Sequence, residues 1–314
     1  MKKILIILFI ISSLYAKGIN QPIAQYLSSG AVTDIVYKDN KLYAATDASS
    51  VDIFDKDSKE LLQKIKVDPI TDFMGDIIDS KVYSVDLIKN KMLILSQAQK
   101  GARRVHIYEN GKLELLIPYT QKLFIAKAKF IDENNILLAL LSNEIISYNI
   151  KKKTQNYRVQ ISQSKFSNFV LNEAKDKVII ADESGSLKIH AIDDASFIEE
   201  LSGQNLDNVF QVDTKNGIIA TAGQDRRVVI YNKKSAYYKK ADFLIYSVGL
   251  SPSGKLVGYA KDEDNNVAIF NTRTKSNLGL YGGNKMTISN ILFINEEDFF
   301  VSSDDETINL YKIQ

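Results

Sequence analysis

The chain has 314 residues, no Cys, no Trp and two His, and its formal charge at pH 7 is +2. The lack of Cys excludes disulfides, thiolate metal sites and a Cys nucleophile, and two His cannot build a His-rich metal site. A nearly neutral charge gives no electrostatic reason to expect nucleic acid or an anionic membrane as a partner.

The first residues have the pattern of a secretory signal peptide. Lys2 and Lys3 precede an apolar run over residues 4–11, which is too short to span a bilayer. Ala16 then offers a small residue at a cleavage position. We expect residues 1–16 to be removed on export to a bacterial periplasm, and the loss of two lysines lowers the formal charge from +2 to 0. An uncleaved N-terminal anchor is the alternative.

From residue 32 onward the chain repeats a strand pattern. Each unit has a short apolar run that ends in small residues and an acid or Asn, then a polar turn and an alternating strand. The alternating strands end at Phe54, Leu95, Tyr148, His190, Tyr231, Phe270 and Tyr311, with spacings of 41, 53, 42, 41, 39 and 41 residues. A period near 41 residues with strand content is typical of a β-propeller. We predict an all-β, seven-bladed β-propeller that forms one domain over residues 17–314.

The spacing of 53 residues indicates an insertion in the second blade. In the placement that we favour, residues 81–86 form the second strand of this blade, and the insertion is a hairpin within residues 97–117. The turn Asn110-Gly111, flanked by alternating residues, is a strong hairpin signal there. In the alternative placement, Val105–Tyr108 is the third strand and the insertion lies near residues 68–81. Both placements give seven blades.

The end of the sequence predicts how the ring closes. The chain reaches Gln314 directly after the third strand of the seventh unit, which leaves that blade without an outer strand. Residues 21–28, before the first blade, form a spare strand-like segment. We expect this segment to supply the missing strand, because such closure covers an open sheet edge and ties the two ends of the domain together.

The repeat resembles that of the WD40 family. Residues 251–255, Ser-Pro-Ser-Gly-Lys, are similar to the family's turn before the second strand, and residues 222–225 with 228–232 are similar to the second half of its blade. The family's Trp and its Gly-His pair are absent, so its buried Asp–His network cannot be carried over. The resemblance implies a propeller that serves as a binding platform.

A narrower resemblance concerns the whole chain. A signal peptide, the lack of Cys and a divergent propeller rich in Lys, Ile and Asn are similar to the NapL-type accessory proteins of periplasmic nitrate reductase systems. This resemblance implies help in assembly of the reductase or in its electron supply, with no catalytic activity and no cofactor.

Few side chains are candidates for catalysis. His190 stands where other units carry Phe, Tyr or Leu, so we interpret it as a packing residue, and His106 in an alternating strand is expected to face solvent. No Gly-x-Ser-x-Gly nucleophile motif occurs. The acidic turns 262–266 and 304–306 leave an oxygen-only Ca²⁺ site open, although Asp and Asn in such turns ordinarily bond to the backbone.

Partner binding is the function that the pattern favours. In propellers of this type, the turns between second and third strands share one face with the connections between blades, and that face commonly binds partners. Asp225, Arg226 and Arg227 are the best candidates in such a turn, because the planar guanidinium of Arg makes paired hydrogen bonds. Further candidates are Asp182, Asp304 and Asp47 in equivalent turns, and Arg103 with Arg104 as a second patch. Ordinary solvated turns are the alternative.

The sequence therefore favours a monomeric, exported scaffold that binds a periplasmic protein, with nitrate reductase components as candidate partners. The alternative is a lactonase-type or other propeller hydrolase, which would need a metal or an acid cluster in the central channel. The scarcity of His and the lack of Cys and Trp favour the scaffold.

Overall fold

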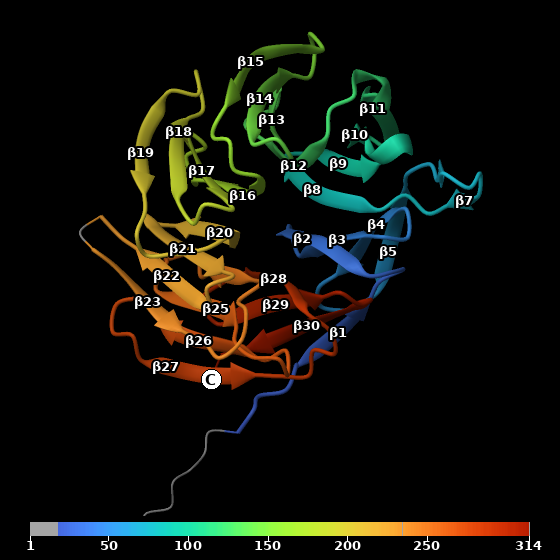
Figure 1. Cartoon of the computed structure of the whole chain (residues 1–314). Coiled ribbons are helices and arrows are strands. Elements are labelled where there is room, and N and C mark those ends of the chain that lie inside the picture. Colours follow the sequence, from blue (N-terminus) through green and yellow to red (C-terminus); the bar gives the residue numbers. More distant parts are fainter. Residues whose placement is uncertain (1–17, 234, 314) are drawn as a thin grey trace, which may run out of the picture.

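The computed structural model describes residues 18–233 and 235–313. They form seven four-stranded antiparallel sheets arranged around a common axis (Figure 1), which confirms the prediction of a seven-bladed β-propeller. The predicted signal peptide, residues 1–16, lies outside the described residues. Within the described part of the chain, no helix is long and apolar enough to cross a membrane.

The first six blades follow one another along the chain, each with its first strand at the axis. Blades 1 to 3 consist of β2 (Val32–Lys38), β3 (Lys41–Thr46), β4 (Ser50–Asp55) and β5 (Leu61–Lys66); β8 (Val82–Ile88), β9 (Lys91–Gln97), β10 (Arg103–Glu109) and β11 (Lys112–Ile117); and β12 (Ile125–Phe130), β13 (Asn135–Leu140), β14 (Glu144–Asn149) and β15 (Thr154–Gln160). Two short 3₁₀ turns, Gln99–Gly101 and Tyr119–Gln121, lie beside blade 2.

Blades 4 to 6 repeat the arrangement. Their strands are β16 (Phe166–Leu171), β17 (Lys177–Asp182), β18 (Leu187–Ala191) and β19 (Phe197–Leu201); β20 (Val209–Lys215), β21 (Ile218–Gly223), β22 (Arg227–Tyr231) and β23 (Ala236–Lys240); and β24 (Val248–Leu250), β25 (Leu256–Ala260), β26 (Val267–Asn271) and β27 (Asn277–Tyr281). Blade 7 combines β28 (Ile288–Phe293), β29 (Asp298–Ser303) and β30 (Thr307–Lys312) with β1 (Ala24–Leu27).

Burial explains the repeated pattern. Second strands such as β13 are buried along nearly their whole length, because both faces of the sheet pack against neighbouring blades. Outer strands such as β15 are mostly exposed, and they are correspondingly polar. Each fully buried Leu or Ile in a second strand stabilises the fold by about 1.5–3 kcal/mol relative to an exposed one.

The expected closure of the ring is confirmed. Residues 24–27 pair antiparallel with β30, from Ala24 opposite Leu310 to Leu27 opposite Thr307. Tyr26 is buried against Phe54 of blade 1 and Phe300 of blade 7, with ring centroids 5.8 and 5.5 Å away. One aromatic side chain of the N-terminal strand therefore joins the first and last blades.

The favoured placement of the insertion in blade 2 is wrong, and the alternative is confirmed. Most of the segment 81–86 belongs to β8, the first strand of the blade, and residues 105–108 lie in its third strand, β10. The error arises because inner and second strands of a propeller are both apolar. The inserted residues form a short hairpin between blades 1 and 2, made of β6 (Ile70–Thr71) and β7 (Ile77–Ile78).

The two histidines are both buried. His190 packs edge-on against Phe197, and its Nδ1 lies 2.8 Å from the Ala195 carbonyl oxygen, which agrees with a packing role. The expectation that His106 faces solvent is wrong, since its side chain is buried in β10. Burial, and then the charge of Arg104, lower the pKa of His106 to about 4. The alternating pattern suggested a half-exposed strand, whereas blade stacking covers both faces.

Candidate functional site

The turns between second and third strands lie beside the connections between blades, and we call their common face the connection face. Backbone hydrogen bonds join the two sets of loops, as in Asp47 N–H to the Ala31 carbonyl oxygen (3.0 Å) and Gln224 N–H to the Asn208 carbonyl oxygen (2.8 Å). The candidate binding residues predicted from the sequence were expected on this face.

The blade 5 candidates occupy the expected turn between β21 and β22. The carboxylate of Asp225 accepts hydrogen bonds from the backbone N–H groups of Leu206 (2.8 Å) and Arg227 (3.0 Å). Arg227 donates to the carbonyl oxygen of Gln204 (2.6 Å), and its guanidinium lies 4.1 Å from the ring centroid of Tyr238. Asp225 and Arg227 therefore hold the loops in place, and Arg226 is the exposed member of the three.

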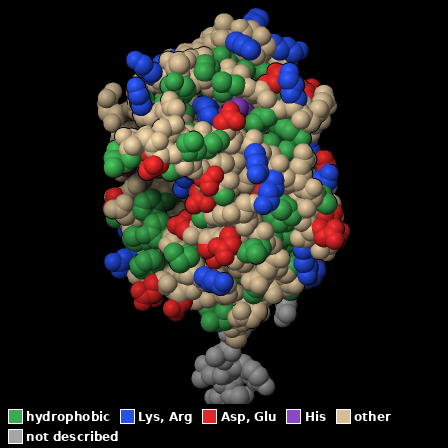
Figure 2. All heavy atoms as spheres, turned by 90° about the vertical axis from the view of Figure 1, so that its right-hand side faces the viewer, with side chains coloured by type: hydrophobic (Ala, Val, Ile, Leu, Met, Phe, Trp, Pro, Cys, Tyr) green, Lys and Arg blue, Asp and Glu red, His purple; other side chains and the backbone are tan. Residues whose placement is uncertain are grey.

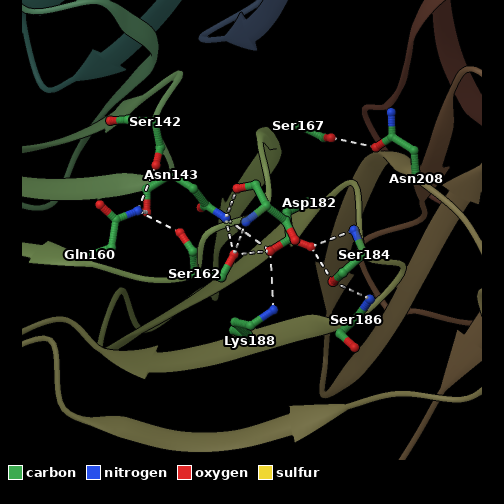
Figure 3. A network of polar contacts seen from close by, with 11 residues as sticks. Ser142, Asn143, Gln160, Ser162, Ser167, Asp182, Ser184, Ser186, Lys188 and Asn208 are labelled. Carbon is green, nitrogen blue, oxygen red and sulfur yellow. Dashed lines mark hydrogen bonds and ion pairs between the residues drawn. The ribbon is translucent and has the colours of Figure 1, made fainter.

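Asp182 was expected in the corresponding turn of blade 4, but it is the last residue of β17, opposite Phe166, and it does not face solvent (Figure 3). Its side chain is 1% exposed and accepts hydrogen bonds from Ser162 Oγ (2.7 Å), Asn143 Nδ2 (3.0 Å) and the Ser184 backbone N–H (2.9 Å). Lys188 Nζ lies 3.2 Å away. Burial favours a raised pKa for Asp182, but the hydrogen bonds from Ser184 and Ser162 outweigh it and lower the pKa. Asp182 therefore links blades 3 and 4 through buried hydrogen bonds.

The remaining acidic candidates are dispersed. Asp47 and Asp304 are exposed on the neighbouring blades 1 and 7, and Asp47 accepts a hydrogen bond from the Ala31 N–H (2.8 Å). Arg226 belongs to blade 5. The structure therefore does not gather the predicted residues into one patch.

Arg103 and Arg104 lie at the start of β10, beside the inserted hairpin. The Arg103 guanidinium stacks on Tyr83, 4.0 Å from its ring centroid. Arg104 Nη2 donates to the carbonyl oxygen of Asp68 (2.6 Å) and to Ser80 Oγ (3.1 Å), which are the two ends of the insertion. Both side chains are half-buried. Arg104 positions the hairpin, whereas Arg103 also donates to the carbonyl oxygens of Gly101 and Ala102 and so holds the turn before β10.

The hairpin itself is the feature that sequence reasoning missed. Phe73 is 95% exposed, Ile77 78% and Met74 72%. Asp72 Oδ1 stabilises the turn, because it accepts hydrogen bonds from the N–H groups of Met74 (2.8 Å) and Asp76 (2.9 Å). The hairpin projects from the side of the propeller at the β7 label (Figure 1). Figure 2, which looks onto that side, shows hydrophobic side chains interspersed with both acidic and basic ones.

A groove lies between this hairpin and the turn from β9 to β10. Its volume is about 810 Å³, and it is lined by residues 70–73 and Ile78 on one side and by residues 97–101 on the other. The groove and the exposed tip together place large apolar side chains on the surface, a feature that often marks an interaction site. The sequence signal was the pair of apolar doublets 73–74 and 77–78, which can be interpreted only once the insertion is correctly placed.

The central channel is lined by charged side chains that join the inner strands. Asp34 Oδ2 accepts a hydrogen bond from the Val85 N–H (3.0 Å) and lies 3.2 Å from Lys129 Nζ. Asp86 and Asp213 accept from backbone N–H groups of the next blade in the same way. Among the described residues, no group of three or more His, Asp or Glu side chains is placed to hold a metal ion.

Lys127 is the channel residue with the most perturbed protonation. Its Nζ donates to Asn168 Oδ1 (2.8 Å) and to the Phe169 carbonyl oxygen (2.9 Å), which joins blade 3 to blade 4. Burial, and then the nearby charge of Lys129, lower the pKa of Lys127 from 10.5 to about 8. The folded protein therefore loses this proton at a lower pH than the unfolded chain does.

The lowered pKa of Lys127 predicts that the free energy of unfolding rises with pH above about 8. Between pH 8 and 10.5 the unfolded chain binds a proton that the folded protein has released, so the free energy of unfolding increases. We expect a gain of roughly 1–3 kcal/mol from this residue, and Lys127→Met should abolish it. Urea denaturation of both proteins at pH 7.5, 8.5 and 9.5 measures the difference. Parallel pH profiles would contradict the prediction.

No family model and no curated protein matches the sequence. The fold by itself leaves the function open, because propellers with the same architecture carry out unrelated functions. A function for this chain therefore has to follow from the chemistry of its own surface.

Proposed function

We propose that this protein is an exported, WD40-like scaffold that binds a protein partner, and that it serves as an accessory protein of periplasmic nitrate reductase. The observation that carries the scaffold role is the hydrogen-bonded hairpin with Phe73, Met74 and Ile77 exposed beside a groove. Large apolar side chains in a cluster on the surface mark interaction sites.

The resemblance of the sequence to NapL-type accessory proteins supports a role in a periplasmic nitrate reductase system. In that role the protein assists assembly of the reductase or its electron supply, and it has no catalytic site of its own. The hydrogen-bonded charges of the channel are consistent with a structural use, since each of Asp34, Asp86 and Asp213 joins two blades.

A deletion strain tests this function. We expect periplasmic nitrate reductase activity to fall several-fold without the gene, and a plasmid copy of the wild-type gene to restore it. The variant Phe73→Ser/Met74→Ser should fail to restore it, whereas Leu206→Ser, a change of an exposed apolar residue in another blade connection, should succeed. Normal reductase activity in the deletion strain would refute the accessory role.

A further inference from the structure

The β6–β7 hairpin combines an apolar tip with several carboxylates, and the nearest cations, among them Arg104 and Lys100, lie at its base and on the other side of the groove. Residues 67–80 contain four Asp and neither Lys nor Arg. Asp76 and Asp79 are exposed beside the apolar residues in the sequence, and Asp68 is exposed at the base of the hairpin, next to Arg104. Exposed carboxylates in one segment create a local negative potential that attracts basic surfaces and repels acidic ones.

The base of the hairpin is held firmly. Arg104 binds both ends of the insertion, at Asp68 and Ser80. Ser49 Oγ donates to Asp79 Oδ1 (2.8 Å) and accepts from the Ser80 N–H (2.6 Å), so blade 1 fixes the second half of the loop. A segment that is ordered before binding loses little conformational entropy on binding, which favours its use as an insertion element.

We propose that this hairpin inserts Phe73 and Met74 into an apolar pocket of a partner protein, and that Lys and Arg side chains surround that pocket. The inference rests on the proposed scaffold function and specifies the chemistry of its partner. Aromatic and Met side chains are the residues that fill such pockets, and charge at the rim governs the rate of association.

The negative charge of the hairpin distinguishes between its possible binding partners. An anionic lipid surface would be repelled by Asp68, Asp76 and Asp79, even though Phe and Met are suited to a bilayer interface. A second copy of this chain would bring two acidic hairpins together in a symmetric contact, which costs electrostatic energy. A protein pocket with an apolar interior and basic residues around its edge matches both the apolar tip of the hairpin and the carboxylates beside it.

Site-specific crosslinking tests the proposal in the full protein. Phe73 is replaced by p-benzoylphenylalanine, cells that export the variant are irradiated, and the crosslinked peptides are identified by mass spectrometry. We expect the crosslink to join a different protein, at an apolar segment with Lys or Arg beside it. Crosslinks to lipid or to a second copy, or the absence of a crosslink, would overturn the proposal.

Variants of the hairpin then test its two chemical features against the purified partner. Phe73→Ser/Met74→Ser should weaken binding at least about 100-fold. Asp68→Asn/Asp76→Asn should slow association about tenfold in low salt and reduce the dependence of binding on salt. The matched controls Leu206→Ser and Asp264→Asn change exposed residues elsewhere and should bind normally. All of these residues are exposed, so melting temperatures should be nearly unchanged.

These outcomes separate the proposal from the function on which it rests. A crosslinked partner that is unrelated to nitrate reductase would refute the reductase role and leave the proposal for the hairpin intact. Conversely, a reductase component that binds the hairpin variants at full affinity would preserve the scaffold function and refute the hairpin as its docking element. Binding of the wild-type protein to vesicles of phosphatidylcholine and phosphatidylglycerol, lost in Phe73→Ser/Met74→Ser, would also refute it.

Discussion

Deletion of residues 18–28 is expected to lower the melting temperature by more than about 10 °C, because this segment closes the ring. Without β1, the backbone groups of β30 from Thr307 to Leu310 lose their partners, and Phe54 and Phe300 lose the aromatic ring that lies between them. An open sheet edge also promotes aggregation.

The single change Tyr26→Ala isolates the packing contribution of the closure. Tyr26 is 1% exposed, and its hydroxyl donates to the Lys56 carbonyl oxygen at 2.5 Å. We expect a loss of about 3–5 kcal/mol in the free energy of unfolding, as for other buried aromatic residues cut back to Ala. Tyr26→Phe should lose only the hydrogen bond, about 0.5–1.5 kcal/mol.

Leu27 provides the matched control for Tyr26. It is the next residue in the same strand, but it points outward and is 69% exposed. Leu27→Ala should therefore change stability by less than about 0.5 kcal/mol. Urea denaturation followed by circular dichroism measures all three variants. If Tyr26→Ala and Leu27→Ala were equally stable, the ring would not depend on β1 packing.

Asp182→Ala is expected to lower the free energy of unfolding by about 3–5 kcal/mol, because it breaks a buried ion pair from one side. Lys188 is 14% exposed and would be left with an uncompensated charge. Asn143 and Ser162 both donate hydrogen bonds to Asp182 Oδ2, so each would lose its acceptor. Asp304→Ala, in the turn after β29 of blade 7, is the control: Asp304 is exposed, so this substitution should be tolerated.

The effect of Asp182 should also depend on pH. Its pKa in the folded protein is lowered, because the hydrogen bonds from Ser184 and Ser162 outweigh the effect of burial. The stabilisation is therefore complete above about pH 4, the ordinary pKa of Asp, and it is lost as pH falls through the lowered value. Asp182→Ala should lack this acid-dependent component. Adding Lys188→Met should recover part of the stability, whereas no recovery would show that the ion pair is not the source of the loss.

The period of the apolar runs was sufficient to predict the number of blades. A second strand such as β13 must be apolar on both faces because a blade lies on each side, and this requirement recurs in every unit. The role of residues 21–28 could also be predicted from the sequence, because the seventh blade had only three strands and therefore one open edge. Tyr26 could not be singled out, because its partners Phe54 and Phe300 are far apart in the sequence.

The role of each candidate side chain depended on contacts between distant segments. Asp225 and Asp304 lie in the turns after β21 and β29, whereas Asp182 is the last residue of β17. There Asp182 meets Ser162 and Asn143 from the previous blade, whereas Asp304 remains exposed. The local sequence cannot show which loop lies over a turn. His106 was misjudged for the same reason, because its burial comes from neighbouring blades and not from its own strand.

The sequence by itself determined the architecture, because each blade is specified by a short local pattern and seven repeats of that pattern fill a ring. Only the tertiary structure decided which surface is available to a partner. The insertion could be placed in two ways, since inner and second strands have the same apolar composition. Residues 70–78 lie outside the four-stranded sheets of the blades, and Phe73, Met74 and Ile77 remain exposed because no blade covers them.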